Sequence, residues 1–247
     1  MFNILKNYII DLINLIGNWF HTVVPIVVKP TPGNTKVTLF DVIKAYTITL
    51  TSYYPLGSTQ INACIPSIDE ATMQLVADLI TTNATSNGLS VPYLAACIKQ
   101  ESAFSPGTYN HNLNKSNPVV AFSHTDFGLC QFSGTCLPSK PGMEGLTAAE
   151  MTAKAFDPNW AVPEMAAVMK GNMAAAELAL TTDSVLAANT KILNTTTLSD
   201  VEWNATLWYN TGIQGGTLAV KTMNTVKLAH PGHVGTWYAL FVKALNG

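Results

Sequence analysis

Apolar residues recur at helical spacing at the start of the chain, and polar residues form a separate stripe there. Eight apolar side chains would line one face of a helix over residues 2–28: Ile4, Leu5, Tyr8, Ile9, Leu12, Ile16, Trp19 and Phe20. Amide and acidic side chains recur every three or four positions: Asn3, Asn7, Asp11, Asn14 and Asn18. This pattern predicts an amphipathic N-terminal helix that lies on a membrane or docks to partner subunits.

Two other interpretations of this segment stay open. Residues 8–28 are long enough to span a bilayer as a helix. A cleavable signal peptide fits least well, because only Lys6 supplies positive charge before the apolar run and no small-residue cleavage site follows it.

A connector follows the N-terminal segment. Pro and Gly residues interrupt the chain at residues 29–36. Residues 35–54 are rich in Thr, Val, Ile and Tyr, and the alternation of Tyr46, Ile48 and Leu50 with threonines favours a strand. A helix that begins at Asp41 is the alternative. The connector could therefore contain β structure.

From residue 67 to the C-terminus the apolar spacing is helical. Ser67 and Glu70 form a capping-box pattern that predicts a helix through Ile80. Further helices follow, with breaks near Asn87 and at residues 107–126 and 211–216. We predict a mainly α-helical protein in three parts: a hydrophobic N-terminal helix (1–30), a short connector (31–66) and a helical domain (67–247).

Residues 91–106 predict a short helix that ends in a carboxylate. Ser90 can cap this helix, and Pro106 prevents its continuation. Glu101 shares a helical face with three apolar residues: Leu94, Cys97 and Ile98. Apolar neighbours disfavour the anion, so Glu101 is predicted to have a raised pKa and to act as a proton donor near neutral pH. The simpler alternative is a glutamate at a helix end that faces solvent.

Two later segments carry polar groups suited to a ligand. Residues 126–133 read DFGLCQFS, where Gly128 permits close backbone approach and Gln131 offers both a donor and an acceptor. Residues 205–216 read ATLWYNTGIQGG, a composition suited to a loop that stacks on and hydrogen-bonds a sugar. Its alternative is a buried helix that ends at a glycine cap.

In this order, the three segments resemble the catalytic domain of soluble lytic transglycosylases and goose-type lysozymes. In that family a helix ends in Glu-Ser, and G-L-M-Q-like and A-Y-N-x-G-like motifs follow. The matching residues here are Glu101, Ser102, Gly128, Leu129, Gln131, Tyr209, Asn210 and Gly212. Residues 155–169 resemble the start of the D-P-x-x-N-I helix of the family, and Tyr238 in residues 236–245 resembles the tyrosine of its closing helix.

The resemblance covers residues 67–247 and implies a lysozyme-like helical fold. Three features depart from the family pattern. Cys130 replaces the usual Met, Trp208 stands where a small residue is common, and the Asn-rich stretch before Asp126 is longer than in the compact form. These departures concern the substrate groove.

The resemblance implies cleavage of the β-1,4 bond between N-acetylmuramic acid and N-acetylglucosamine in peptidoglycan. Glu101 would act first as general acid and then as general base, and internal attack would give 1,6-anhydromuramic ends. The alternative is a hydrolytic muramidase in which Asp126, about 6.5–9.5 Å from Glu101, activates water. Asp126 could instead cap the next helix or be solvated in a loop.

The resemblance also implies supporting roles. Ser102 and Tyr238 would hold or hydrogen-bond Glu101. Contacts with the saccharide are expected from Gly128, Gln131, Tyr209 and Asn210. Phe127 and Trp208 are candidates for stacking on a sugar, with packing in the core as the alternative for both.

The composition adds little to this interpretation. Charged residues make up 11% of the chain, against about 25% in typical proteins. With a net charge of -2 and no Arg, the chain gives no electrostatic case for nucleic acid.

No cofactor or metal is predicted. The four cysteines, Cys64, Cys97, Cys130 and Cys136, lack metal-ligand spacing. Buried free thiols are favoured over a disulfide between Cys130 and Cys136. His111 and His124 are interpreted as lone surface histidines.

The apolar N-terminus and low charge suggest an enzyme that an assembly delivers to its substrate. We expect a virion-associated or membrane-associated protein that acts in the bacterial periplasm or cell wall. Residues 2–28 would contact the membrane or a virion subunit. A structural virion component, or a glycan-binding module that retains the fold without turnover, is the alternative from another class of protein.

Overall fold

The computed structural model describes residues 26–47, 63–111, 121–224 and 228–246. The helix predicted over residues 2–28 falls almost wholly outside the described residues, and so does the Thr-rich stretch at 48–54. Helices predominate in the described ranges, which confirms the prediction of a mainly α-helical protein. None of these helices is long and apolar enough to cross a bilayer.

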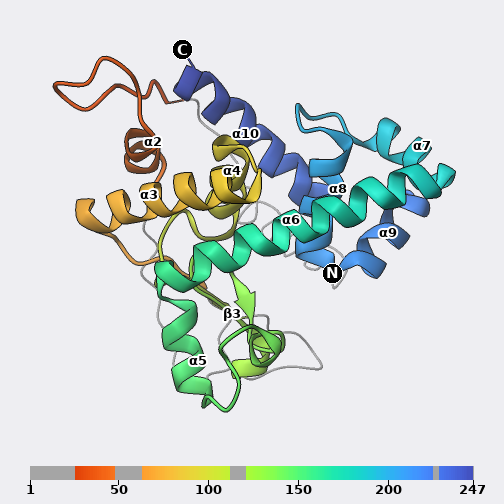
Figure 1. Ribbon diagram of the computed structural model, residues 1–247, viewed down its shortest axis with the longest axis horizontal. Helices are drawn as coiled ribbons and strands as arrows, with labels where there is room; N and C mark the ends of the chain where they lie inside the picture. The colour runs from red at the N-terminus through yellow and green to blue at the C-terminus, as the bar shows by residue number, and fades with distance from the viewer. Residues whose placement is uncertain (1–25, 48–62, 112–120, 225–227, 247) are drawn as a thin grey trace, which may run out of the picture.

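The helices surround a single long element (Figure 1). Helix α6 runs across the molecule, with α2, α3 and α4 toward one end and α7 and α9 toward the other, while α5 and the strands form a lobe below it. The bounds are α2 (Leu39–Tyr46), α3 (Glu70–Asn87), α4 (Val91–Ser102), α5 (Ala148–Ala155), α6 (Pro158–Thr182), α7 (Ser184–Leu193), α8 (Asp200–Thr211), α9 (Ile213–Lys221) and α10 (Ala229–Asn246).

Helix α4 forms where the sequence predicted it. The Ser90 side chain accepts a hydrogen bond from the Tyr93 N–H, and Pro92 lies in the first turn. The helix ends at Ala103, which has a left-handed conformation (φ 51°) and donates its N–H to the Lys99 carbonyl. Helices α3 and α10 pack against α4, and this packing buries most of the α4 side chains. Glu101, in the last turn of α4, is only partly buried.

Helix α6 begins at the position that the family resemblance indicates. The Asp157 side chain accepts from the Asn159 N–H, and Pro158 is the first helical residue. Helices α3 and α8 both pack on α6, and the Tyr93 hydroxyl of α4 donates to the Glu202 carbonyl of α8, so these helices form one core.

A small antiparallel sheet forms the lower lobe with α5. Its strands are β1 (Ala63–Cys64), β2 (Tyr109–His111), β3 (Thr125–Phe127) and β4 (Phe132–Ser133), paired in the order β1-β2-β3-β4. Asn110 pairs with Asp126, and Asp126 pairs with Ser133. Three of these strands fall where only a helix break or a motif was predicted, because runs of two or three residues carry no measurable alternation.

Two helices begin at other residues than predicted. Residues 39–46 form α2, which confirms the helical alternative for this stretch but starts it before Asp41, with Thr38 and Asp41 completing a capping box. Helix α3 is capped by Asp69 rather than Ser67, and it continues past Ile80 to Asn87, where Gly88 ends it in a left-handed conformation. In both cases the capping side chain lies two or three residues from the predicted start: Thr38 is three residues before Asp41, and Asp69 is two residues after Ser67.

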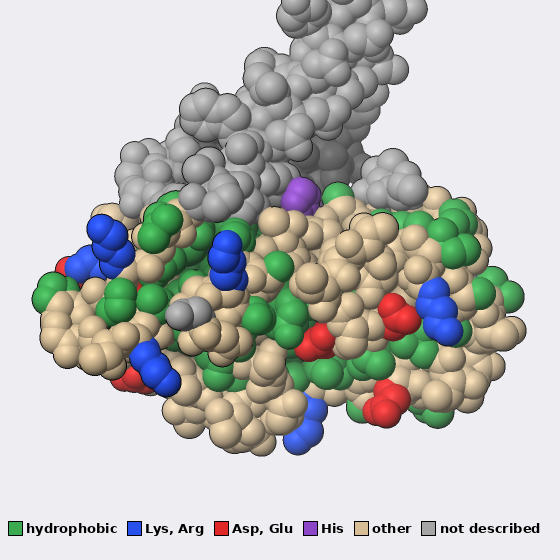
Figure 2. Space-filling model, turned by 90° about the horizontal axis from the view of Figure 1, so that it is seen from above, with side chains coloured by type: hydrophobic (Ala, Val, Ile, Leu, Met, Phe, Trp, Pro, Cys, Tyr) green, Lys and Arg blue, Asp and Glu red, His purple; other side chains and the backbone are tan. Residues whose placement is uncertain are grey.

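Charged side chains are dispersed over the face of the molecule that Figure 2 shows. The face shown in Figure 2 has scattered Lys and acidic side chains among hydrophobic and neutral ones, as expected for a chain with 11% charged residues. No basic face suited to nucleic acid is visible in the described part of this view.

Candidate active site

One cavity of about 720 Å³ lies where α4, α8, α10 and the sheet meet. Its lining includes most of the residues that the sequence motifs indicated. Among the lining residues are Lys99, Gln100, Glu101, Asp126, Gln131, Cys136, Lys140, Trp208, Tyr209, Asn210, His230 and Trp237. A volume of this size fits a ligand of several hundred cubic ångströms, such as two or more sugar rings.

Glu101 forms a hydrogen-bonded pair with His230 in this cavity. Nε2 of His230 lies 2.8 Å from Oε1 of Glu101, and each side chain is 13% exposed. Glu101 comes from the last turn of α4 and His230 from the first turn of α10, two helices that pack along each other. The solvent-facing alternative for Glu101 is therefore wrong, while its role as a proton donor stays a prediction.

The surroundings of His230 indicate which nitrogen carries the proton. Nδ1 is buried and has no hydrogen-bond partner among the described residues. A buried N–H without an acceptor is more costly than a bare lone pair, so we place the proton on Nε2. In this tautomer Nε2–H donates to Oε1 of Glu101, and Oε2 is the oxygen left for chemistry.

Two neutral thiols lie in the core near Glu101. Burial raises the pKa of Cys97 and of Cys130, and the nearby charge of Glu101 raises both further. All four cysteines are free, so the predicted free thiols are confirmed, but Cys64 is half-buried and Cys136 is exposed.

The turn between β3 and β4 depends on Gly128 and Gln131. Gly128 has φ +79°, and a Cβ at this position would lie 1.9 Å from the carbonyl oxygen of Ala155. The close backbone approach predicted at Gly128 is therefore to α5. Gln131 lines the cavity and donates Nε2–H to the carbonyls of Gly128 (2.9 Å) and Thr108 (3.2 Å).

Residues 205–211 belong to helix α8, so the prediction of a sugar-binding loop is wrong and its alternative, a buried helix with a glycine cap, is correct. Gly212 ends α8 at φ 71°. Tyr209 donates its hydroxyl to the Cys130 carbonyl, and burial raises the pKa of this hydroxyl. Asn210 is exposed and lines the cavity. Trp208 also contributes to the lining, but only 2% of this residue is exposed, so most of its ring is packed in the core.

Asp126 lines the same cavity from strand β3. It lies in the middle of the sheet, opposite Asn110 and Ser133, and does not cap a helix. Its neighbour Phe127 points to the other face of the strand and packs between Phe122 and Phe156. Phe127 is 6% exposed and does not line the cavity, which favours core packing over sugar stacking.

Two predicted supporting residues lie elsewhere. The Ser102 hydroxyl donates to the Ile98 carbonyl of its own helix and is 1% exposed. Tyr238 is half-buried further along α10 and is not among the residues that line the cavity. Helix α10 instead presents His230 to Glu101. His230 follows Glu101 by 129 residues, and no spacing or motif in the sequence connects the two.

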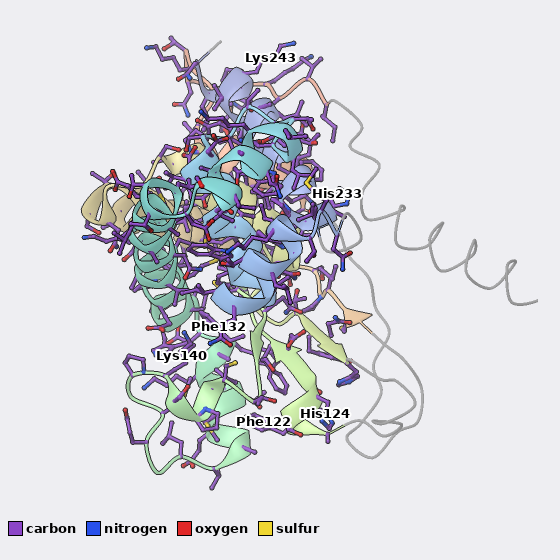
Figure 3. The ribbon with its side chains drawn as sticks, turned by 90° about the vertical axis from the view of Figure 1, so that its right-hand side faces the viewer. Phe122, His124, Phe132, Lys140, His233 and Lys243 are labelled. Carbon is purple, nitrogen blue, oxygen red and sulfur yellow. The ribbon has the colours of Figure 1, made fainter. Side chains whose placement is uncertain are left out.

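The two histidines singled out by the sequence lie in the lower lobe. His124 is exposed, as predicted, and Figure 3 shows it at the edge of the sheet beside Phe122. His111 is buried, with Nδ1 2.8 Å from the Thr125 hydroxyl, so its interpretation as a surface residue is wrong. Across the described ranges, His, Cys, Asp and Glu form no group that could hold a metal ion.

Comparison with protein-family models, with curated proteins and with solved structures found no match for this chain. The interpretation of the cavity therefore depends on its own residues.

Proposed function

We propose that this chain is a peptidoglycan lytic transglycosylase. The observation that carries the proposal is the placement of Glu101. Its carboxyl group is mostly buried, is oriented by His230, and faces a cavity that Gln131, Tyr209 and Asn210 also line. A proton donor of this kind, in a cavity large enough for several sugars, suits cleavage of a glycosidic bond.

In the proposed reaction Glu101 first donates one proton and then accepts another. Oε2–H protonates the glycosidic oxygen as its bond to C1 of the muramic acid breaks, and this proton leaves with the departing sugar. The C6 hydroxyl of the muramic acid then attacks C1 and gives its proton to Oε2, which forms the 1,6-anhydro product and restores the acid. Because the attacking group is part of the substrate, the reaction gains from a high effective molarity and needs no second carboxylate.

The neutral polar groups of the cavity suit saccharide binding. Asn210 is exposed, and Nε2 of Gln131 is already held by two carbonyls, which orients its side-chain oxygen. Tyr209 joins α8 to the β3–β4 turn through the Cys130 carbonyl, so we assign it the role of holding the wall in shape.

Hydrolysis is the second candidate, and one observation favours it. Asp126 lines the same cavity as Glu101 from strand β3, where a carboxylate could activate water. Its product would carry a reducing end instead of an anhydro ring.

The test is mass spectrometry of muropeptides released from purified peptidoglycan. Wild type and Glu101→Gln are compared, with Glu177→Gln as a control, because Glu177 is exposed on α6 outside the cavity. We expect anhydromuramic ends from wild type and the control, and none from Glu101→Gln. Reducing ends that disappear in Asp126→Asn would establish hydrolysis. A folded wild type that releases nothing would favour a structural virion component or a glycan-binding module.

We further propose that the protein reaches the cell wall as part of a virion or from a membrane. This proposal depends on the amphipathic pattern of residues 2–28. Flotation of the full chain with lipid vesicles tests it, and a protein that stays at the bottom of the gradient and is monomeric would contradict it.

A further inference from the structure

Two lysines line the cavity, and each places its ammonium group over an aromatic ring. Nζ of Lys99 lies 4.9 Å from the centre of the Trp237 ring, and Nζ of Lys140 lies 5.1 Å from the centre of the Phe132 ring. Figure 3 shows Lys140 and Phe132 beside each other at the top of the lower lobe. The two sites differ in what balances the positive charge.

Lys140 already has an anionic partner. Its Nζ lies 3.0 Å from Oε1 of Glu164, and both side chains are largely buried. Lys99 makes no ion pair and no hydrogen bond through Nζ in the described part of the chain, although only 7% of the residue is exposed. The ring of Trp237 attracts the cation but offers no anion.

The surroundings of Lys99 are ordered. Trp237 donates Nε1–H to Oε1 of Gln100 at 3.3 Å, and its ring packs edge-on against Tyr46 at 5.5 Å. The Trp237 ring beneath Lys99 is thus held in place by contacts with Gln100 and with Tyr46. Burial without an anion lowers the pKa of Lys99 to about 8, so most molecules carry the charge at neutral pH.

A buried and unpaired cation that lines a cavity is suited to an anionic ligand group. Lys99 is two residues from Glu101 on the same helix, and both side chains line the same cavity. A glycan bound in this cavity with its glycosidic bond at Glu101 can therefore extend to Lys99.

We propose that Lys99 forms an anion subsite that binds a carboxylate carried by the glycan next to the bond at Glu101. The identity of the glycan rests on the proposed function, whereas the anion subsite does not. In peptidoglycan the carboxylate has two sources: the lactyl group of a muramic acid without a peptide, or the stem peptide where one is attached.

The experiment uses the inactive full-length Glu101→Gln protein and three tetrasaccharides in isothermal titration calorimetry. The first is neutral N-acetylchitotetraose, the second is an alternating N-acetylglucosamine–N-acetylmuramic acid glycan without peptides, and the third is the same glycan with stem peptides. Two substitutions are added to this protein. Lys99→Met keeps a linear side chain of similar length but removes the charge, and Lys140→Met is the matched control.

We expect Lys99→Met to weaken binding of one or both acidic glycans about tenfold and to leave the affinity for N-acetylchitotetraose unchanged. The preference of the protein for acidic over neutral glycans should therefore disappear. The glycan that loses affinity identifies the source of the carboxylate. Lys140→Met should keep the preference, because Glu164 already balances Lys140. An equal effect of Lys99→Met on all three glycans would overturn the proposal.

A second probe separates failure of the subsite from failure of the proposed function. Sodium lactate is titrated into Glu101→Gln, and the indole N–H signal of Trp237, assigned with Trp237→Phe, is followed by NMR. We expect a shift that Lys99→Met abolishes. If no glycan binds but lactate gives this shift, the proposed function fails and the subsite stands. If lactate leaves the signal unmoved, the subsite is refuted.

Discussion

The two walls of the cavity differ in the kind of chemistry they carry. The wall formed by α4 and α10 holds Glu101, His230 and Lys99, which are mostly buried and titratable. The other wall, formed by the sheet and α8, presents mainly neutral groups whose hydrogen bonds go to backbone carbonyls, with the Asp126 carboxylate as an exception. The comparison suggests that the α4–α10 wall provides the proton donor and positive charge, while the sheet–α8 wall mainly provides shape.

The largest expected effect is on the charged wall. Glu101→Gln removes the proposed acid, so we expect turnover to fall by about 10³-fold or more while the melting temperature changes little. Release of soluble muropeptides measures the rate. Retention of more than a tenth of wild-type activity would show that the acid lies elsewhere.

The next effect concerns the shape of the wall formed by the sheet and α8. Gly128→Ala introduces a Cβ 1.9 Å from the Ala155 oxygen at a positive φ, and we expect a loss of about 3 kcal/mol in the free energy of unfolding. Gly145→Ala is the matched control, since Gly145 also has a positive φ (+75°) but a Cβ there meets nothing within 4 Å. It should cost only about 1 kcal/mol in urea unfolding. Equal losses would mean that the contact with α5 is unimportant.

Lys99 and Lys140 should respond to the same substitution with opposite signs. Lys99→Met is expected to stabilise the fold by about 1–3 kcal/mol at pH 7, because the buried ammonium has no anion. Lys140→Met should destabilise it, because Glu164 would lose its partner. A destabilised Lys99→Met would assign Lys99 a structural role.

The pH dependence follows from the direction of the Lys99 shift. The pKa is about 8 in the folded protein, against 10.5 ordinarily, so the unfolded chain binds more protons between these values. The contribution of Lys99 to stability therefore rises from pH 8 to 10.5, and below about pH 8 its full cost is present. Urea titrations of wild type and Lys99→Met should differ most at pH 7 and converge near pH 10.5.

The smallest effect separates positioning from catalysis. His230→Leu removes the hydrogen bond to Glu101, and we expect kcat/KM to fall about 10- to 100-fold, whereas His230→Gln, which can still donate, should keep most of the activity. The pH–rate profile is the decisive readout. Identical profiles for wild type and His230→Leu would reduce His230 to a packing residue.

Local signals in the sequence were sufficient for several elements. Ser90 and Pro92 specify the start of α4, and Asp157 and Pro158 specify the start of α6. Glu101, Gln131, Tyr209 and Asn210 come together in one cavity as the motif order suggested. These predictions succeeded where caps and helical spacing are encoded within a few residues.

Other features depend on contacts between distant segments. His230 gains its role only because α10 packs along α4, and its place in the sequence gives no sign of this. Lys99 is an ordinary basic residue in the sequence, and only packing against Trp237 reveals its burial. The short strands are stabilised by pairing rather than by propensity, so residues 109–111 looked like part of a helix break.

The distribution of the thiols makes the cavity accessible to selective labelling. Cys97 and Cys130 are buried and are held as neutral thiols, which react slowly with alkylating reagents. Cys136 is exposed and lines the cavity. A maleimide reagent applied to the native protein should therefore modify Cys136 well before either buried thiol, and once the half-buried Cys64 is replaced by Ser, a fluorophore on Cys136 would report ligand arrival.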